Sequence, residues 1–173
     1  MAPAGDITFR TASAGDIPAI QDLSARIWRE HYPGIITHAQ IDYMLGKMYA
    51  EEAIADEIRN KGYRYVVVAK DATPVGYIAY RFETPNATVL ISKLYLLPSL
   101  HGKGIGQRML QHVRDDAVSR GAKTVHLFVN KNNLKAIVAY ERFGFIKAEA
   151  VVTAIGGGFV MDDYRMVLDL RGK

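Results

Sequence analysis

The chain has 173 residues, of which 49% are hydrophobic and 23% are charged, and it contains no cysteine. This length and composition are typical of one soluble globular domain, so we expect a single domain over residues 1–173. The lack of cysteine excludes disulfides, thiolate nucleophiles and zinc–thiolate sites. The sequence has no apolar run near the ~18–20 residues of a membrane span, and its amino terminus lacks the basic and then apolar layout of a secretory signal. We therefore expect a cytoplasmic protein with no membrane partner.

The formal net charge is +4, and basic residues alternate with acidic ones, as in Arg114-Asp115-Asp116. A protein that binds nucleic acid would instead concentrate its lysines and arginines on one face or in a tail. The charge pattern therefore favours an ordinary solvated surface and no nucleic-acid partner. A weakly positive field would also suit a small polyanionic ligand such as a nucleotide cofactor.

The first 62 residues predict one strand and three helices. The strand is expected at Ile7–Thr11, and the helices at Ile17–His31, at residues 37–45 and at residues 51–60. The first helix is capped by Asp16 and broken by Pro33-Gly34. Thr37, with Gln40 three residues later, has the spacing of a capping box and starts the second helix. The third helix stops before Gly62.

The remainder of the chain predicts six strands and two helices. Residues with high β-propensity predict strands at residues 63–69, 75–82, 88–97, 124–129, 145–155 and 159–170. The first helix follows a glycine-rich loop, has apolar residues at i, i+4 spacing from Ile105 to Ala117 and ends at Gly121. The second helix lies within residues 130–143 and ends at Gly144. No repeat, low-complexity tract or linker interrupts this order, which predicts one α+β domain.

The glycine-rich loop carries the most chemical information. Three glycines alternate there, at Gly102, Gly104 and Gly106. Alternating glycines let the backbone approach a ligand closely, and the unpaired N–H groups at a helix N-terminus carry a partial positive charge, so the arrangement suits phosphate. The spacing fits neither the dinucleotide-binding fingerprint nor the Walker loop. A plain strand-to-helix turn would need only one glycine, so three glycines favour a ligand.

A second pattern follows the next expected strand. Asn130 and Asn133 stand where that strand gives way to a helix, and asparagine side chains at such places bond to free backbone groups. Tyr140 lies further along the helix, and Gly144-Phe145 follow its end. Taken alone, the asparagines are explained by capping and Tyr140 by a half-buried core position.

Together the two patterns resemble those of the GCN5-related N-acetyltransferases, in the same order and at the usual distance. Residues 102–106 are similar to the family's acetyl-CoA pyrophosphate loop, and residues 130–136 with Tyr140 are similar to its later coenzyme A segment. The resemblance covers nearly the whole chain. It implies a layered α+β fold with a mixed, mostly antiparallel central sheet flanked by helices. It also implies direct acetyl transfer from acetyl-CoA to an amine, without a covalent enzyme intermediate.

The resemblance assigns cofactor-binding positions in both patterns. These are Leu94, Tyr95, Leu96, His101, Gly102, Lys103, Gly104, Ile105, Gly106, Gln107, Asn130, Asn133 and Ala136. His101 departs from the family, which usually has arginine or glutamine there, and it would help to hold the pyrophosphate less, or only when protonated. The five histidines show no metal-ligand spacing, and no metal is expected. Asp162 and Asp163 are adjacent on one expected strand and would point to opposite faces, so they are poor candidates for a paired-carboxylate site.

The resemblance also implies the catalytic groups. Tyr140 matches the family tyrosine that protonates the departing thiolate, and backbone N–H groups near Leu96 would polarise the thioester carbonyl. The pKa of a phenol, about 10, exceeds that of a thiol, about 8.5, so full proton transfer is uphill by roughly 2 kcal/mol. Glu83, at the end of the strand expected over residues 75–82, is a candidate base for the acceptor amine, acting through water. The alternative for Glu83 is a surface glutamate at a strand end.

Three further segments resemble the PaiA-like polyamine acetyltransferases, at residues 28–36, 40–45 and 156–166. Trp28 and Tyr32 are four residues apart and share a helix face, where they form either an aromatic wall for a cationic acceptor or ordinary packing. A second ammonium group of the acceptor would then bind a nearby carboxylate, one of Asp42, Glu83 or Asp162.

The expected acceptor is therefore a small-molecule amine, most specifically a polyamine such as spermidine or spermine. A protein or peptide N-terminal amine is the enzymatic alternative, and a non-catalytic acetyl-CoA sensor is the other. Members of the family often dimerise, so the strand at residues 159–170 either forms a homodimer contact or closes the sheet internally.

Overall fold

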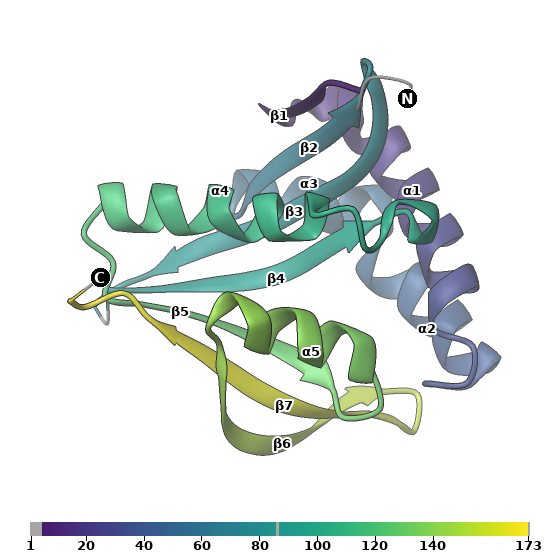
Figure 1. Ribbon diagram of the computed structural model, residues 1–173. Coiled ribbons are helices and arrows are strands. Elements are labelled where there is room, and N and C mark those ends of the chain that lie inside the picture. The colour runs from purple at the N-terminus through teal and green to yellow at the C-terminus, as the bar shows by residue number, and fades with distance from the viewer. Residues whose placement is uncertain (1–4, 86, 173) are drawn as a thin grey trace. The chain divides into compact units, whose positions relative to one another are not determined.

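A computed structural model describes residues 5–85 and 87–172 (Figure 1). Residues 1–4 and Asn86 lie outside the described residues. The expectation that the amino terminus lacks a secretory signal falls partly on residues 1–4. The sheet has the strand order β1-β2-β3-β4-β5-β7-β6. The strands are β1 (Ile7–Thr11), β2 (Arg64–Lys70), β3 (Thr73–Glu83), β4 (Thr88–Leu96), β5 (Thr124–Asn130), β6 (Ile146–Gly156) and β7 (Phe159–Asp169). The α-helices are α1 (Ile17–His31), α2 (His38–Met48), α3 (Glu51–Arg59), α4 (Ile105–Ser119) and α5 (Leu134–Phe143).

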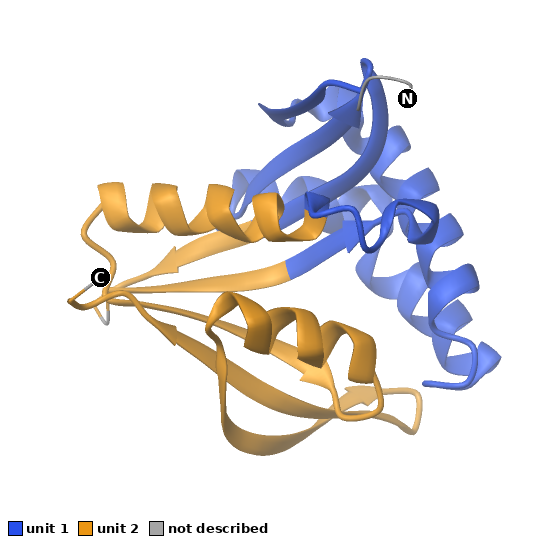
Figure 2. Cartoon of the chain, viewed as in Figure 1, with its two compact units in different colours: residues 1–79, 93–105 blue, residues 80–92, 106–173 orange. Residues whose placement is uncertain are grey.

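The chain divides into two compact units, which Figure 2 shows in different colours. Unit 1 consists of residues 1–79 and 93–105, and unit 2 of residues 80–92 and 106–173. Strands β3 and β4 each have one part in unit 1 and the other part in unit 2. The expectation of a single domain over the whole chain stays a prediction.

The sheet is mixed and mostly antiparallel, which confirms the fold class that the resemblance implies. In unit 1, β1 pairs antiparallel with β2. In unit 2, β5 pairs parallel with β4 and antiparallel with β7, which pairs antiparallel with β6. β7 thus has a partner on both sides, which supports its internal role, and β6 is the edge strand. Register shifts interrupt β6 between Lys147 and Glu149 and between Ala154 and Gly156.

The buried face of α1 and the cap of α2 follow their sequence signals, but the expected cap of α1 does not form. Asp16 directly precedes α1, yet its side chain makes no hydrogen bond to that helix and instead accepts one from the N–H of Ser13. The apolar residues at helical spacing in α1 are buried, namely Ile17, Ile20, Leu23 and Ile27. α2 begins after Thr37, whose side-chain oxygen accepts a hydrogen bond from the N–H of Gln40. That bond satisfies one of the N–H groups that a helix start leaves without a partner. The buried face of α1 and the cap of α2 could both be predicted from residues a few positions apart in the sequence.

In unit 2, α4 is as expected, and α5 is shorter than expected. α4 turns Met109, Val113 and Ala117 inward, each 0% exposed. α5 begins at Leu134, later than the expected start, because Asn130 still pairs within β5 and Asn133 caps the helix. Figure 1 shows α4 and α5 on the same side of the strands of unit 2. No described helix of this unit lies on the opposite face.

A buried ion pair joins α3 to β4 in unit 1. Lys93 is 6% exposed, and its Nζ lies 2.8 Å from Oε2 of Glu57. Tyr65 donates a hydrogen bond to the same carboxylate. Nζ also lies over three aromatic rings, those of Tyr49, Tyr63 and Tyr65. Burial lowers the pKa of the Lys93 ammonium, the charge of Glu57 opposes that shift, and the aromatic rings add a cation–π attraction.

Removing the carboxylate from this pair should destabilise the fold. In Glu57→Gln the new side chain still accepts from Tyr65, but Lys93 keeps a buried charge without a counter-ion. We expect the free energy of unfolding to fall by about 3 kcal/mol, measured by urea unfolding. Asp22→Asn breaks an exposed ion pair with Arg26 and is the control, which should change the stability little. Equal losses in the two variants would contradict the role assigned to burial.

Candidate functional site

The glycine-rich loop of unit 1 follows the end of β4. A short 3-10 turn at Pro98–Leu100 leads into the loop, where Gly102 and Gly104 have φ angles of 75° and 79°. L-residues with a side chain rarely adopt this left-handed conformation, so the backbone path requires glycine at both positions. α4 begins at Ile105, and the first N–H groups of the helix, which have no partner within it, directly follow the loop.

Gly106 has no such backbone requirement. It lies in the first turn of α4 without a positive φ, and a Cβ built there would meet no atom within 4 Å. A glycine in a helix costs about 1 kcal/mol relative to alanine, so its presence indicates that space beside the backbone is needed. The bare backbone and the exposed Lys103 fit the phosphate groups of coenzyme A.

The end of β4 carries the other cofactor-binding positions of unit 1. Leu96 is buried, whereas Leu94 and Tyr95 are partly exposed. Nε2 of His101 lies 2.9 Å from the carbonyl oxygen of Leu96, and the ring packs edge-on against His31. A carbonyl oxygen can only accept, so His101 donates this hydrogen bond and ties the loop to the strand end. The residue that departs from the family pattern thus has a structural contact.

Unit 2 contains the asparagines of the second pattern. Oδ1 of Asn130 accepts a hydrogen bond from the N–H of Asn132, and the side chain of Asn133 accepts one from the N–H of Ala136. Asn133 is buried, and its cap ends the turn that leads from β5 into α5. The capping role inferred from the sequence is therefore confirmed, and Ala136 lies in the first turn of α5.

Contacts on α5 fix the position of Tyr140 within unit 2. Nε2 of Gln107, on α4, donates a hydrogen bond to the carbonyl of Ala139 at 3.1 Å. The next residue, Tyr140, is partly exposed, and its ring packs edge-on against Phe145 with 5.9 Å between the centroids. Gly144 ends the helix with a φ of 120°. The ring of Tyr140 is thus held against Phe145, just beyond the end of α5.

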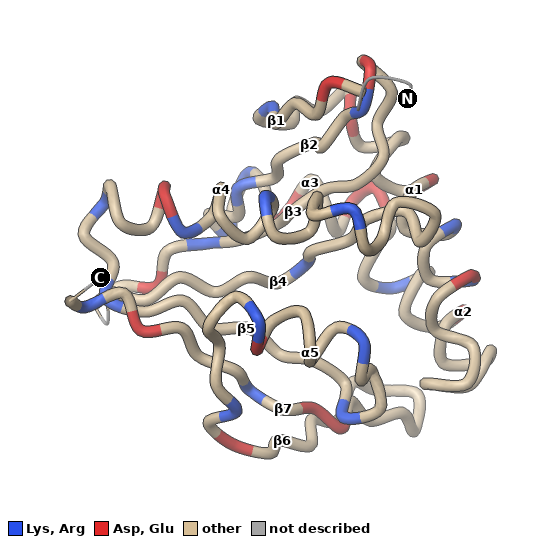
Figure 3. The backbone as a smooth tube through the Cα atoms, viewed as in Figure 1, with Lys and Arg blue, Asp and Glu red and all other residues tan. Residues whose placement is uncertain are grey.

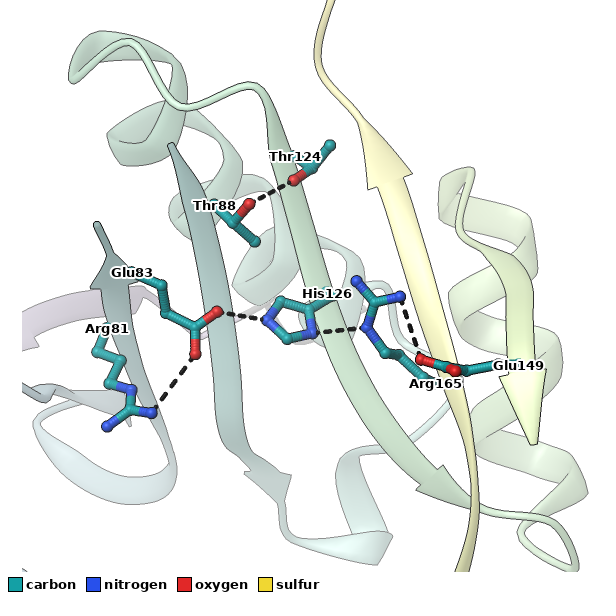
Figure 4. A network of polar contacts seen from close by, with 7 residues as sticks. All are labelled: Arg81, Glu83, Thr88, Thr124, His126, Glu149 and Arg165. Atoms are coloured by element: carbon teal, nitrogen blue, oxygen red, sulfur yellow. Dashed lines mark hydrogen bonds and ion pairs between the residues drawn. The ribbon is translucent and has the colours of Figure 1, made fainter. Parts of the chain in front are cut away.

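Glu83 belongs to a polar network that crosses the sheet of unit 2 (Figure 4). Its Oε2 lies 2.8 Å from Nε2 of His126, and Nδ1 of that ring lies 3.1 Å from Nε of Arg165. Because an arginine N–H can only donate, Nδ1 carries the lone pair, so the ring is neutral and donates through Nε2 to Glu83. Arg81 and Glu149 extend the network at its two ends, each through a contact of 3.4 Å.

This network places Glu83 away from the second pattern. His126 is the third residue of β5 and Asn130 is its last, so four residues, about 13 Å along a strand, separate them. A role for Glu83 as the base stays a prediction. Its position and its partners favour the alternative of a glutamate at a strand end, although its side chain is only partly exposed and not fully on the surface.

Trp28 and Tyr32 form part of an aromatic cluster in unit 1. Their rings stack with 4.2 Å between the centroids, and Tyr49 and Tyr95 contact the Trp28 ring at 5.5 and 5.9 Å. Trp28 is 3% exposed, which favours packing over a wall open to solvent, while Tyr32 is partly exposed. Nε1 of Trp28 is enclosed and has no hydrogen-bond acceptor among the described residues. An acceptor atom on a ligand would stabilise this donor.

Of the carboxylates considered for a second ammonium group, Asp42 pairs with Arg29 and Asp162 with Lys131. Asp163 faces away from Asp162, as the strand alternation predicts, and is buried where Asp162 is exposed. Lys93 and Asp163 are buried charged residues to which the sequence assigned no role. Lys93 has a signal that could have found it, since it is the one charged residue of β4, whereas Asp163 lies among three other charged residues of β7.

Basic and acidic residues are interspersed along both units (Figure 3), in keeping with the sequence. Over residues 5–85 and 87–172, no three histidine, aspartate or glutamate side chains are grouped so as to hold a metal ion. Two of the histidines, His101 and His126, make the hydrogen bonds described above. None of the helices in this part of the chain has the length and apolar character to cross a membrane.

Comparison with known proteins gives consistent results. The chain is 29% identical over 151 residues to streptothricin acetyltransferase of Streptomyces lavendulae, which covers 79% of this chain and 80% of that protein. It is 24% identical over 160 residues to spermidine N(1)-acetyltransferase of Thermoplasma acidophilum, which covers 90% of this chain and 96% of that protein. The crystal structure of PaiA N-acetyltransferase from Thermoplasma acidophilum in complex with coenzyme A has the same fold, with a TM-score of 0.81 and 20% identity over 95% of this chain and 99% of that one.

A match to a family profile is the most direct of these findings. Residues 19–145 match the acetyltransferase (GNAT) family, a stretch that contains both the glycine-rich loop and Tyr140. The match extends over most of the chain and agrees with the fold. The chain therefore belongs to the acetyltransferase (GNAT) family.

Proposed function

We propose that this acetyltransferase moves the acetyl group of acetyl-CoA to a primary amine of a small polyamine such as spermidine or spermine. The observation that supports this acceptor is the similarity to the spermidine N(1)-acetyltransferase of Thermoplasma, which spans 96% of that protein. A similarity of this extent is not confined to the cofactor segments that all acceptor classes share. It includes the helical region that contains Trp28 and Tyr32.

Acetyl-CoA supplies the acetyl group as an activated thioester. Backbone N–H groups of residues 102–106 would hold its phosphates, and the ammonium of Lys103 would add positive charge. Residues 94–96, Gln107 and residues 130–136 would contact the remainder of the molecule. Support for this assignment comes from the bare backbone around Gly106 and from the coenzyme A bound in the PaiA structure.

Tyr140 is the proposed acid. Its hydroxyl would donate a proton to the sulfur that leaves when the amine attacks the thioester carbonyl, and a backbone N–H near Leu96 would stabilise the negative oxygen that develops there. Packing against Phe145 anchors the ring that carries this hydroxyl. The uphill step of roughly 2 kcal/mol from phenol to thiolate is small beside an ordinary catalytic barrier.

The acceptor amine must also lose a proton, since an alkylamine with a pKa near 10.4 is mostly protonated at neutral pH. Glu83 would have to act through water, and its carboxylate already accepts a hydrogen bond from His126. Glu83 is therefore not assigned this proton. The small fraction of neutral amine would attack, and the proton that its nitrogen loses as the amide forms would pass through solvent and restore the phenol of Tyr140.

A second acceptor class is favoured by one specific observation. The relative named for streptothricin is 29% identical to this chain, somewhat more than the spermidine enzyme, although it covers less of the chain. Streptothricin therefore belongs in any acceptor panel, together with the N-terminal amine of a peptide.

Gly106→Ala should weaken the binding of coenzyme A without lowering the stability of the fold. Alanine favours a helix by about 1 kcal/mol, so stability should be unchanged or higher, whereas the new Cβ occupies the space assigned to phosphate. We expect coenzyme A to bind at least about tenfold more weakly in isothermal titration calorimetry. Gly46→Ala in α2, where a Cβ also meets no atom within 4 Å, is the matched control and should keep the affinity. Unchanged binding in Gly106→Ala would contradict the loop assignment.

Tyr140→Phe keeps the ring packed on Phe145 and removes the proton donor. We expect kcat to fall by about a hundredfold while coenzyme A affinity is retained, measured by thiol release and by calorimetry. Tyr43→Phe on α2 is the control and should leave both quantities unchanged. A non-catalytic sensor would show no turnover to lose, and an enzyme with unchanged kcat would exclude Tyr140 as the acid.

The acceptor is tested by following thiol release from acetyl-CoA with spermidine, spermine, short diamines, streptothricin and a peptide with a free N-terminus. We expect the highest kcat/KM with the polyamines, because the similarity to the spermidine enzyme covers nearly both chains. Preference for streptothricin or the peptide would keep the family and the chemistry but overturn the proposed substrate.

A further inference from the structure

The carboxylate of Asp163 is buried in unit 2 without a counter-charge of its own. Asp163 lies on β7 and is 5% exposed, and no described group donates a hydrogen bond to its side chain. Two cations close to Asp163 along the strands are engaged elsewhere. Lys131 pairs with Asp162, and the guanidinium of Arg165 is bonded to His126 and Glu149 (Figure 4).

An ionised carboxylate in this position is unfavourable for folding. Burial raises the pKa of Asp163 to about 6, the charge of Asp162 adds to the shift, and Lys131 opposes it. Because this pKa lies above the ordinary 3.8, the native state binds more protons than the unfolded state between about pH 4 and pH 6. Stability therefore falls as pH rises through this interval and stays reduced above it. A neutral residue would fold better here, so a reason for the carboxylate must lie outside folding.

The strand register places Asp163 beside a cofactor segment. Asp163 is directly opposite Asn130 on β5 and Val151 on β6. Residues directly opposite each other share a face of the sheet, and Arg165, two positions along β7, shares that face too. Asn130 is the first residue of the segment assigned to coenzyme A. The unpaired carboxylate thus lies where β5 gives way to that segment.

We propose that Asp163 binds an ammonium group of the amine substrate. An ammonium group donates hydrogen bonds to both carboxylate oxygens. It also supplies a positive charge, which Lys131 and Arg165 do not because they pair with other groups. Asp163 is not fully enclosed, since 5% of its surface stays accessible. This assignment rests on the proposed N-acetyltransferase function, because the amine is the substrate that meets the cofactor. A polyamine, with ammonium groups beyond the one that is acetylated, fits it best.

Asp163→Asn tests the assignment, since it keeps the shape of the side chain and removes its charge. We expect KM for the accepted amine to rise about ten- to a hundredfold, with kcat at saturating amine and KM for acetyl-CoA little changed. We also expect the variant to be more stable than the wild type at neutral pH, and this difference should disappear below about pH 3, where Asp163 is neutral in both the native and the unfolded state. The charged neighbours Asp162, Lys131, Arg165 and Glu149, and His126, are the same in both proteins, so the pH-dependent difference reports Asp163.

Asp169→Asn is the matched control, because Asp169 lies on the same strand, is exposed and pairs with Arg171, and KM for the amine should not change in this variant. A wild-type KM in Asp163→Asn, or a loss of stability at neutral pH without a change in KM, would overturn the assignment while the proposed function stands. If the wild type acetylates no acceptor, the proposed function fails by itself. In that case the binding of spermidine without turnover tests the assignment. If spermidine raises the melting temperature of the wild type but not that of Asp163→Asn, the assignment is supported. If both proteins show the same change, or none, it is overturned.

Discussion

A charged side chain that leaves water needs a partner of opposite charge or several hydrogen bonds, and the polar interior of each unit follows from this requirement. In unit 1, Lys93 meets Glu57 under three tyrosine rings. In unit 2, Glu83 meets the neutral ring of His126, whose second nitrogen is taken by Arg165. Asp163 is the buried charge that this rule leaves unexplained within the described chain. The ammonium group proposed above would supply that partner.

The sequence predicted those features that depend on residues close together in the chain. The cap at Thr37 and the row of buried residues in α4 are local properties, and each appears in the structure as expected. The long-range pairs could not be predicted. Lys93 and Glu57 are 36 positions apart, and Glu83 and His126 are 43 apart. Periodicity shows which face of an element is buried but not which other element packs against it.

The candidate site likewise combines a local feature that could be predicted with side-chain roles that could not. The glycine-rich loop presents backbone N–H groups, and its path is determined by its own glycines, so its form could be predicted from the family resemblance. Side-chain roles depend on neighbours that the resemblance does not supply. His101 is bonded to the carbonyl of Leu96, and Trp28 is packed within an aromatic cluster. A resemblance therefore transfers a backbone feature more securely than it transfers the task of one side chain.

Strand β6 has a further consequence for the behaviour of the protein at high concentration. A free sheet edge with exposed apolar residues, such as Ile146 and Val152, is a template on which strands of other molecules can add. The two register shifts in β6 bend the strand and break the regular spacing of its backbone groups, and Lys147 and Glu149 place opposite charges at one of them. An incoming strand would meet only short runs of matching donors and acceptors. The irregular edge thus protects the molecule against polymerisation through its own sheet.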